Sequence, residues 1–142
     1  MPKTPSGAPT LAPHPSTPLH IFPSTPRAAG QARTYARQVA AKSMPGITGE
    51  QLAQVELLVS ELVTNACRYG TEPGDLIAAG VTTSATGAQV QVHDPARRRP
   101  RHKPPNVNRQ RGRGLLIIEA IASNWGVTDR PLGKTVWAEL AW

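Results

Sequence analysis

Hydrophobic residues recur every three or four positions between Glu50 and Gly70, and this spacing predicts a helix with one buried face. The apolar positions are Leu52, Val55, Val59, Leu62, Val63 and Ala66. Thr48 followed by Gln51 predicts a capping box at the start of the helix, and Gly70 is expected to take the left-handed conformation after its end. The rest of the chain is expected to be organised around this helix.

Two further helices are predicted on either side of it along the chain. One begins with Thr25 as N-cap and Pro26 in the first turn and runs to Lys42. Its shared face carries Ala28, Ala32, Tyr35, Ala36 and Val39. The other spans Gly114 to Ser123, and because it is apolar nearly all round we expect it to be mostly buried.

Alternation of apolar and polar residues predicts strands in the remaining segments. The candidates are Leu19–Phe22, Leu76–Thr83, Ala88–His93, Asn124–Thr128 and Lys134–Ala141. Ser84–Gly87 is typical of a hairpin connection. In the third candidate Val90 and Val92 alternate with polar residues, which predicts one buried face. Helices interleaved with hairpin-linked strands favour an α+β fold, a two-layer sandwich of helices on a sheet.

The length of 142 residues fits one domain with a tail. Residues 1–17 hold five prolines among Ser, Thr, Gly and Ala, so we expect a disordered Pro-rich tail before a domain at 18–142. No apolar run approaches the ~20 residues that span a bilayer, and no secretory signal is recognisable. Cys67 is the only cysteine, excludes an internal disulfide, fits a cytoplasmic protein and is expected to be buried.

The net charge of +7 is concentrated in one segment. Eight Lys and Arg residues and no acidic residue lie between Pro95 and Gly114, so the rest of the chain is close to neutral. A loop of this length is typical of a lid or a disordered segment. It can close over a phosphate ligand, contact an acidic protein or remain a solvated run. It contains no aromatic residue for stacking on bases, which argues against nucleic acid.

Glu61, Asn65 and Arg68 fall at positions i, i+4 and i+7 of the central helix and therefore share one side of it. A carboxylate and a carboxamide one turn apart offer the oxygen ligands that Mg²⁺ prefers, and the carboxylate can also accept a proton. Taken alone, such a pattern is more often a solvated polar face than a metal or catalytic site.

Four segments in order resemble the motifs of the GHKL ATPase superfamily, which includes histidine kinases. They are the N box in residues 61–70 (ELVTNACRYG), a reduced G1 box in Val92–Pro95, a G2 box in Gly112–Leu115 and the closing strand at Gly133–Ala138. The resemblance extends from Leu19 to Trp142 and is nearest to small anti-sigma-factor serine/threonine kinases. It implies a Bergerat-type ATP-binding fold, with a mixed, mostly antiparallel sheet covered on one face by helices.

The same resemblance implies roles for individual residues. Asn65 would bind Mg²⁺ and Glu61 would act as the general base. Asp94 would accept a hydrogen bond from the adenine amino group, assisted by Thr135. The remaining nucleotide-binding residues would be Arg68, Gly112, Arg113, Gly114 and Leu115. Pro95 and the two residues after it replace the spaced glycines that usually follow the G1 aspartate.

The function implied is that of an ATP- and Mg²⁺-dependent protein serine/threonine kinase acting in transcription regulation. It would transfer the γ-phosphoryl group to a Ser or Thr of a small antagonist protein, or exchange partners with bound nucleotide. The implied partners are a sigma factor or an anti-anti-sigma-type antagonist, and a homodimer is compatible with the pattern. The alternatives are a degenerate, non-catalytic interaction domain and a nucleic-acid-binding module that uses the basic lid.

Overall fold

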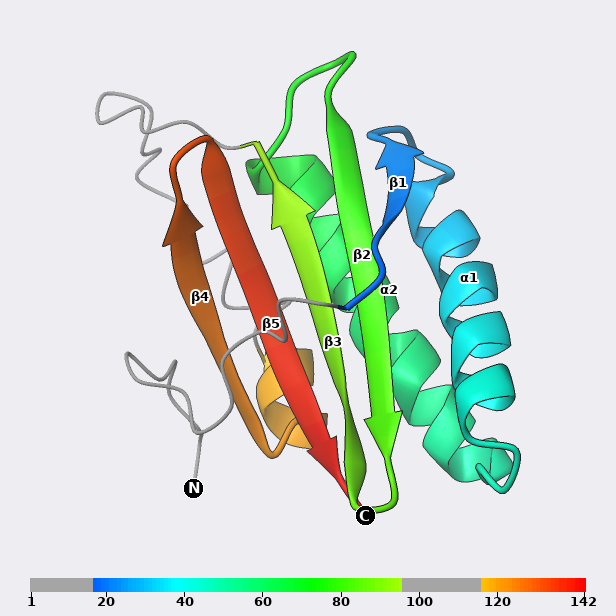
Figure 1. The fold of residues 1–142 in the computed structure, drawn as a ribbon. Coiled ribbons are helices and arrows are strands. Elements are labelled where there is room, and N and C mark those ends of the chain that lie inside the picture. The colour runs from blue at the N-terminus through cyan, green and yellow to red at the C-terminus, as the bar shows by residue number, and fades with distance from the viewer. Residues whose placement is uncertain (1–16, 96–115) are drawn as a thin grey trace.

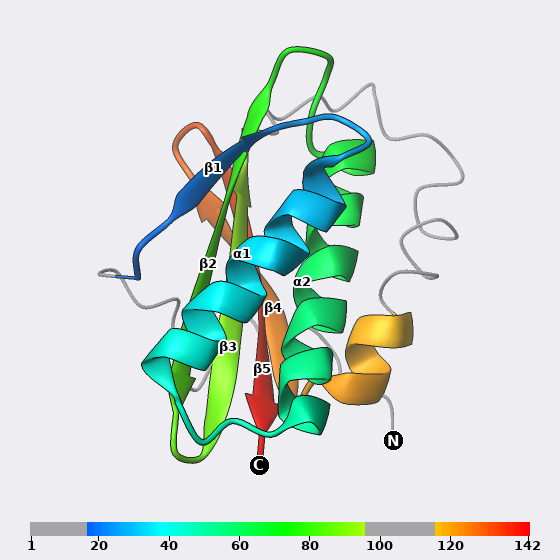
Figure 2. The ribbon, with the colours of Figure 1, turned by 90° about the vertical axis from the view of Figure 1, so that its right-hand side faces the viewer.

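A computed structural model describes residues 17–95 and 116–142 of the chain. They form two layers, a twisted five-stranded sheet and a layer of helices that covers one of its faces (Figures 1 and 2). The predicted α+β sandwich is therefore confirmed. The predicted disordered tail, except for Thr17, and the basic lid, except for Pro95, lie outside the described residues.

The elements follow the predicted order along the chain. The helices are α1 (Ala28–Ser43), α2 (Gly49–Tyr69) and a short helix at residues 116–121. The strands are β1 (His20–Pro23), β2 (Leu76–Ser84), β3 (Gly87–Asp94), β4 (Asn124–Arg130) and β5 (Gly133–Ala141). Each predicted strand is present, with ends that differ from the prediction by at most two residues.

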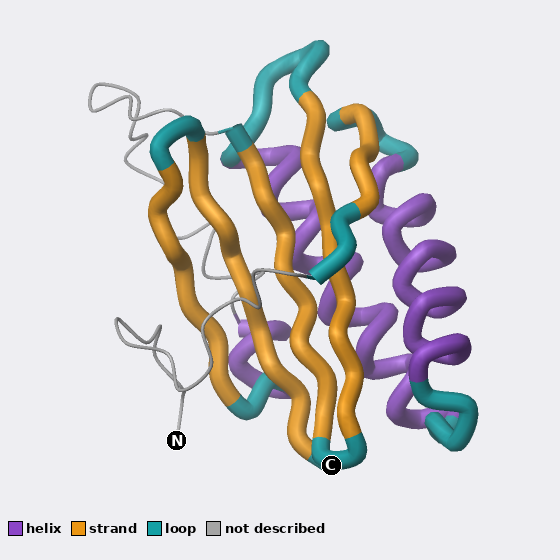
Figure 3. The backbone as a smooth tube through the Cα atoms, viewed as in Figure 1, coloured by secondary structure: helices purple, strands orange, loops and turns teal. Residues whose placement is uncertain are grey.

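The five strands lie side by side in the order β1-β2-β3-β5-β4 (Figure 3). Each neighbouring pair is antiparallel. Two hairpins, β2–β3 and β4–β5, are joined by the pairing of β3 with β5. The expected mixed sheet is thus wholly antiparallel in the part of the chain that the structure describes. The end of β3, which carries Asp94, lies in the middle of the sheet.

Helix α2 forms as its apolar period and its N-terminal capping box predict. The Gln51 backbone N–H donates to Thr48 Oγ1 at 3.0 Å, and the Thr48 N–H donates to Gln51 Oε1 at 2.9 Å, which completes the capping box. The apolar stripe is buried against β3 and the neighbouring strands. Helix α1 buries four alanines, Ala28, Ala32, Ala36 and Ala40, and such small side chains let it pack closely on α2 and the sheet.

Two helix ends differ from the prediction. Helix α1 begins at Ala28, because the Ala28 N–H donates to the Thr25 carbonyl and Pro26 therefore lies in a turn before the helix. Thr25 Oγ1 accepts a hydrogen bond from the Arg27 N–H instead of capping the helix. Gly70 has φ −113° and ψ −2°, so the expected left-handed conformation is wrong.

The two faces of the sheet are both largely covered around β3 and β5. On the inner face, under the helices, Val90 and Val92 belong to the main core. On the opposite, outer face, Gln91 is only 3% exposed and Trp137 is fully buried. The prediction of a single buried face for β3 is therefore wrong.

The short helix at residues 116–121 lies beside α2, on the side away from α1 (Figure 2). Ile118 and Ala122 are buried, whereas Leu116 is 68% exposed. Only one side of this helix joins the core, which corrects the prediction of a mostly buried helix. No helix within residues 17–95 and 116–142 is long and apolar enough to cross a membrane.

Candidate functional site

One flank of α2 is taken up by α1. Arg33 Nη1 donates to Ser60 Oγ at 2.8 Å, and Arg37 Nη1 lies 4.0 Å from Glu56 Oε2. These contacts mark the side of α2 that carries Ser60 and Glu56 as the side facing α1. The opposite flank therefore remains for other contacts.

Glu61, Asn65 and Arg68 lie on that opposite flank. At 100° per residue, they stand roughly a quarter to half a turn away from Ser60 and Glu56, beside the buried stripe. Glu61 and Asn65 are half-buried, and Arg68 is exposed. The structure thus brings the three predicted residues to one side of α2, the side on which the short helix at 116–121 lies (Figure 2).

Asp94 ends β3 and reaches the C-terminal end of α2. Its side chain is buried, with 2% of the residue exposed. A Cβ atom at Gly70 would lie 2.5 Å from the Asp94 carboxyl carbon, closer than real Cβ contacts allow. Gly70 is therefore needed for space: it lets this carboxylate lie directly against the end of α2.

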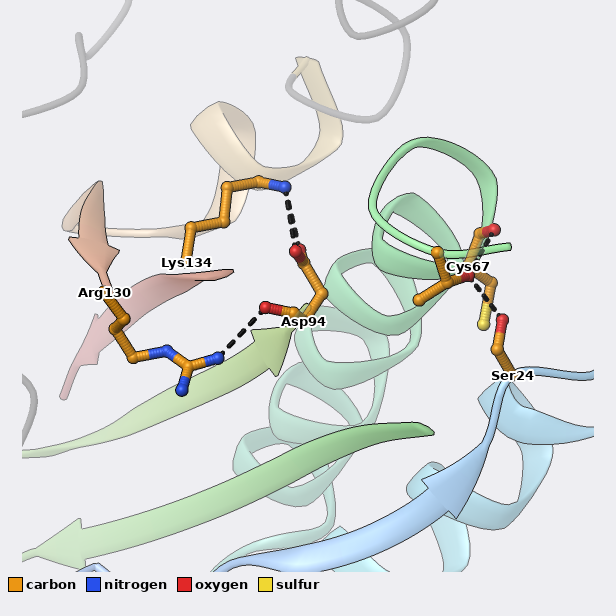
Figure 4. A network of polar contacts seen from close by, with 6 residues as sticks. Ser24, Cys67, Asp94, Arg130 and Lys134 are labelled. Carbon is orange, nitrogen blue, oxygen red and sulfur yellow. Dashed lines mark hydrogen bonds and ion pairs between the residues drawn. The ribbon is translucent and has the colours of Figure 1, made fainter. Parts of the chain in front are cut away.

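The turn between β4 and β5 contacts Asp94 from the other side. Lys134 Nζ lies 3.1 Å from Oδ1 and 2.9 Å from Oδ2 of Asp94 (Figure 4). Arg130 Nη2 donates to the Asp94 carbonyl at 3.0 Å. A Cβ at Gly133 would collide with the same carbonyl oxygen. Asp94 is thus enclosed by two glycines and two cations.

No role was predicted from the sequence for Lys134 or Arg130. The structure places both at Asp94. Asp94 and Lys134 are opposite each other on neighbouring strands and carry opposite charges, but this pairing follows from the register of β3 with β5, which the sequence does not fix. No local signal in the sequence marks Arg130 either, which reaches the Asp94 carbonyl from the other strand of the β4–β5 hairpin.

Thr135 is not brought together with Asp94. It is opposite His93 in the register, and successive residues of a strand point to opposite faces of the sheet. Lys134 therefore shares the inner face with Asp94, while Thr135 lies on the outer face and is 2% exposed. Its proposed assistance to Asp94 stays a prediction, and the two side chains lie on opposite faces of the sheet.

His93 lies on the outer face beside these groups. Its Nε2 is 2.7 Å from Gln91 Oε1. Burial lowers the pKa of the His93 imidazole, and the positive charge of Arg130 lowers it further, while Asp94 partly opposes the shift. The neutral imidazole is therefore the form that fits the folded protein.

The predicted phosphate-binding residues Gly112, Arg113, Gly114 and Leu115 lie outside the described residues. The donor set that is described suits Mg²⁺ carried by a triphosphate. Within residues 17–95 and 116–142, no group of three or more His, Cys, Asp or Glu side chains forms a metal site. Mg²⁺ usually binds through one or two protein oxygens and substrate phosphates, and Asn65 with Glu61 one turn earlier fits that pattern.

A separate cavity of about 480 Å³ lies between the start of α1 and the end of α2. Ser24 Oγ is 2.6 Å from Thr71 Oγ1, which donates to the Cys67 carbonyl at 2.9 Å. These residues lie on the far side of the α2 end from Asp94 (Figure 4). Cys67 lines this cavity and is partly exposed, contrary to the expectation of a buried side chain. The cavity contains none of the predicted site residues.

The chain was compared with known protein families, and one family model matches most of it. The model of the histidine kinase-like ATPase domain matches residues 22–140, which include Glu61, Asn65, Asp94 and Thr135. Among curated proteins, none matches the chain.

Two solved structures match the chain in part. The histidine kinase domain of a blue-light activated histidine kinase from Erythrobacter litoralis EL346 is 17% identical, with a TM-score of 0.49; the match covers 84% of this chain and 61% of that one. The histidine kinase AdeS of Acinetobacter baumannii is 12% identical, with a TM-score of 0.46 and coverage of 88% and 68%. This chain thus spans about three-fifths of the length of the first of these structures.

Proposed function

Because the chain belongs to the histidine kinase-like ATPase domain family, we propose that it is a Mg²⁺- and ATP-dependent regulatory protein. The proposal depends most on one observation, the position of buried Asp94 against Gly70 at the end of the helix that carries Asn65 and Glu61. The Asp94 carboxylate, for the adenine base, and the oxygen ligands for the metal thereby lie along one helix.

The spacing along α2 suits an extended nucleotide. At 1.5 Å per residue, Asn65 lies about 7.5 Å and Glu61 about 14 Å along the helix axis from Gly70. A nucleotide whose base contacts Asp94 would therefore direct its phosphates along the flank that carries Asn65 and Glu61. This flank is free of α1, as the contacts of Ser60 and Glu56 show.

Each residue then has a distinct role. Asp94 accepts a hydrogen bond from the adenine amino group. Asn65 would hold Mg²⁺, which would supply positive charge to the phosphates. Glu61 accepts the proton of the attacking hydroxyl. The hydroxyl oxygen forms a bond to the γ-phosphorus while the bond from that phosphorus to the bridging oxygen breaks and ADP leaves. The donors proposed for the phosphates are Gly112 to Leu115, with Arg113 adding charge.

The acceptor in this proposal is a Ser or Thr of a small antagonist protein, and the regulated partner is a sigma factor. The support is the order of the four sequence motifs, which resembles anti-sigma-factor serine/threonine kinases. Exchange of partners with bound nucleotide, without transfer, is the non-catalytic form of the same regulation.

Calorimetric titration with ATP, with and without Mg²⁺, tests the nucleotide site. We expect the wild type to bind ATP in a Mg²⁺-dependent manner and Asn65→Ala to lose that dependence. Gln38→Ala is the matched control, because Gln38 is an exposed amide on α1 and removes no proposed ligand. Absence of binding to a folded wild type would reject the proposal.

Substitution of the proposed base separates binding from chemistry. Glu61→Gln should bind ATP as the wild type does. It should hydrolyse ATP, with water in place of the acceptor hydroxyl, at least 100-fold more slowly, because general-base catalysis contributes about 10²- to 10⁴-fold. Equal rates in the two proteins would remove Glu61 from the catalytic role while leaving ATP binding in place.

One observation favours a second candidate, a non-catalytic interaction domain that has lost ATP. Lys134 Nζ already contacts both oxygens of Asp94, the group proposed to bind adenine. If this ion pair excludes the adenine base, the wild type will not differ from buffer in the titration, whereas Lys134→Met will bind ATP. Binding by the wild type would reject this second candidate.

A further inference from the structure

Helix α2 ends without the backbone closure that finishes many helices. The Gly70 N–H donates to the Ala66 carbonyl at 2.8 Å, but Gly70 does not adopt the left-handed conformation that brings later N–H groups to the remaining carbonyls. The Cys67 carbonyl is bound by a side chain instead, because Thr71 Oγ1 donates to it at 2.9 Å. The end of α2 therefore depends on the Thr71 hydroxyl group.

The Thr71 hydroxyl is itself held by the connection between β1 and α1. Ser24 Oγ lies 2.6 Å from Thr71 Oγ1. A threonine hydroxyl has one hydrogen, and Thr71 uses it on the Cys67 carbonyl, so Ser24 is the donor to Thr71. The two bonds thus form a chain with one direction, from Ser24 through Thr71 to Cys67. Hydrogen bonds in such a chain polarise and strengthen one another.

Ser24 is fixed in turn by the start of β2. Its backbone N–H donates to the Asp75 carbonyl at 2.9 Å. The Asp75 N–H donates to the Glu72 carbonyl at 3.0 Å, and the Glu72 N–H donates to Asp75 Oδ2 at 2.8 Å. Because Glu72 follows Thr71 in the chain, these bonds close a ring that returns to the Thr71 hydroxyl. The end of α2, the start of β2 and the connection after β1 are therefore tied together.

Gly70 connects this ring to Asp94. It directly precedes Thr71, and the Asp94 carboxyl group occupies the space in which a Gly70 side chain would lie. Ser24 and Cys67 lie on one side of the end of α2, and Asp94 lies on the other (Figure 4). A shift of Thr71 would therefore move Gly70 relative to the carboxylate.

We propose that Ser24 and Thr71 are positioning residues for the adenine base. Their hydroxyl chain holds the end of α2 against Asp94, in the place where this carboxylate accepts the adenine amino group. The inference rests on the proposed function, because it needs Asp94 as the ligand of the base. Both hydroxyls act through Gly70 and not by touching the nucleotide. The phosphates depend on Asn65, about 7.5 Å further along the helix, so the ring governs affinity for the base alone.

Calorimetric titration of the full chain with Mg·ATP tests this assignment. Thr71→Val keeps the shape of the side chain, loses the hydroxyl and should raise the Kd for ATP about fivefold, the effect of one hydrogen bond of typical net strength. Ser24→Ala should act in the same direction. The double variant should be no weaker than Thr71→Val, because Ser24 acts only through Thr71. Thr71→Ser keeps the hydroxyl and should bind ATP as the wild type does.

A matched control is available at the end of α1, where the same pattern occurs. Ser43 Oγ donates to the Val39 carbonyl, four residues earlier, at 2.8 Å and lies 2.8 Å from Thr83 Oγ1. The end of α1 lies beside the start of α2, far from the end of α2 (Figure 2). Ser43→Ala thus removes hydrogen bonds of the same kind and should leave the Kd for ATP unchanged.

Inorganic Mg·tripolyphosphate, which has no base, separates positioning of the base from a general loosening of the fold. Thr71→Val should bind tripolyphosphate as the wild type does. Equal loss of affinity for ATP and for tripolyphosphate would overturn the inference. So would the same Kd for ATP in Thr71→Val and Ser43→Ala, and in both cases the proposed function would stand. Absence of ATP binding by the folded wild type would reject the proposed function and this inference with it.

Discussion

Gly70 and Asp94 are in direct contact across the two layers of the fold, although 23 positions separate them in the chain. The carboxyl group of Asp94 occupies the space that a side chain at position 70 would fill. The end of α2 and the end of β3 therefore determine each other's position, and the proposed adenine-binding site depends on both.

Gly70→Ala should disturb this contact. The added methyl group would overpack a buried site, and we expect a loss of about 1–3 kcal/mol in the free energy of unfolding together with weaker ATP binding. Urea denaturation and the ATP titration measure the two effects. Gly49→Ala is the control, because nothing lies within 4 Å of a Cβ at Gly49. Equal stability of the two variants would show that α2 and Asp94 can move apart freely.

Lys134→Met should have opposite effects on stability and on nucleotide affinity. It leaves the buried Asp94 carboxylate without its ammonium partner, which costs about 1–3 kcal/mol once the partial exposure of Lys134 is considered. It also removes a competitor for the carboxylate, so the Kd for ATP should fall several-fold.

The stability of Lys134→Met and its Kd for ATP must be compared with those of Lys134→Arg, which keeps the charge. Weaker ATP binding by Lys134→Met than by Lys134→Arg would contradict the competition and would indicate that Lys134 itself contacts the nucleotide.

His93 should make stability depend on pH. Its pKa is lowered in the folded protein relative to the ordinary value of about 6.5, so the folded state binds fewer protons than the unfolded state. The contribution of neutral His93 to the free energy of unfolding is fully present above pH 6.5, and it is lost as the pH falls through the lower, folded-state pKa of His93. Urea denaturation of the wild type and His93→Gln should therefore show a difference that shrinks or reverses in acid.

The capping box should contribute measurably to α2. Thr48→Ala removes the acceptor of the Gln51 N–H and should lower the free energy of unfolding by about 1 kcal/mol. Thr48→Ser keeps the hydroxyl and should retain most of the stability. If Thr48→Ala and Thr48→Ser unfold at the same urea concentration, the cap does not stabilise this helix.

Much of the fold was predictable because its signals are local. The three- and four-residue period of Val55, Val59 and Leu62 and the Thr48–Gln51 pair predict α2 and its start, and the structure has both. Alternation in the strands predicts β2, β3 and β5 in the same way. These patterns depend on which face of one element is apolar, and a single segment of sequence carries that information.

The site was less predictable because it depends on register between distant strands. Whether Lys134 or Thr135 faces Asp94 is decided by one residue of offset in the β3–β5 pairing, which no local pattern fixes. The same offset buries Trp137 on the outer face. Gly70 is also explained only by Asp94, a residue on another layer, so a helix-end rule assigned it the wrong conformation.

The pairing of β3 with β5 has a consequence for how the chain folds. The two hairpins can form early from neighbouring residues, but β3 pairs with β5 only when the hairpins meet across the connecting residues 95–123. Such a long-range contact is expected to be the slow step of folding. Because the entropy of loop closure rises only with the logarithm of length, by about 0.6 kcal/mol per doubling, insertions between β3 and β4 should be tolerated far better than insertions within either hairpin.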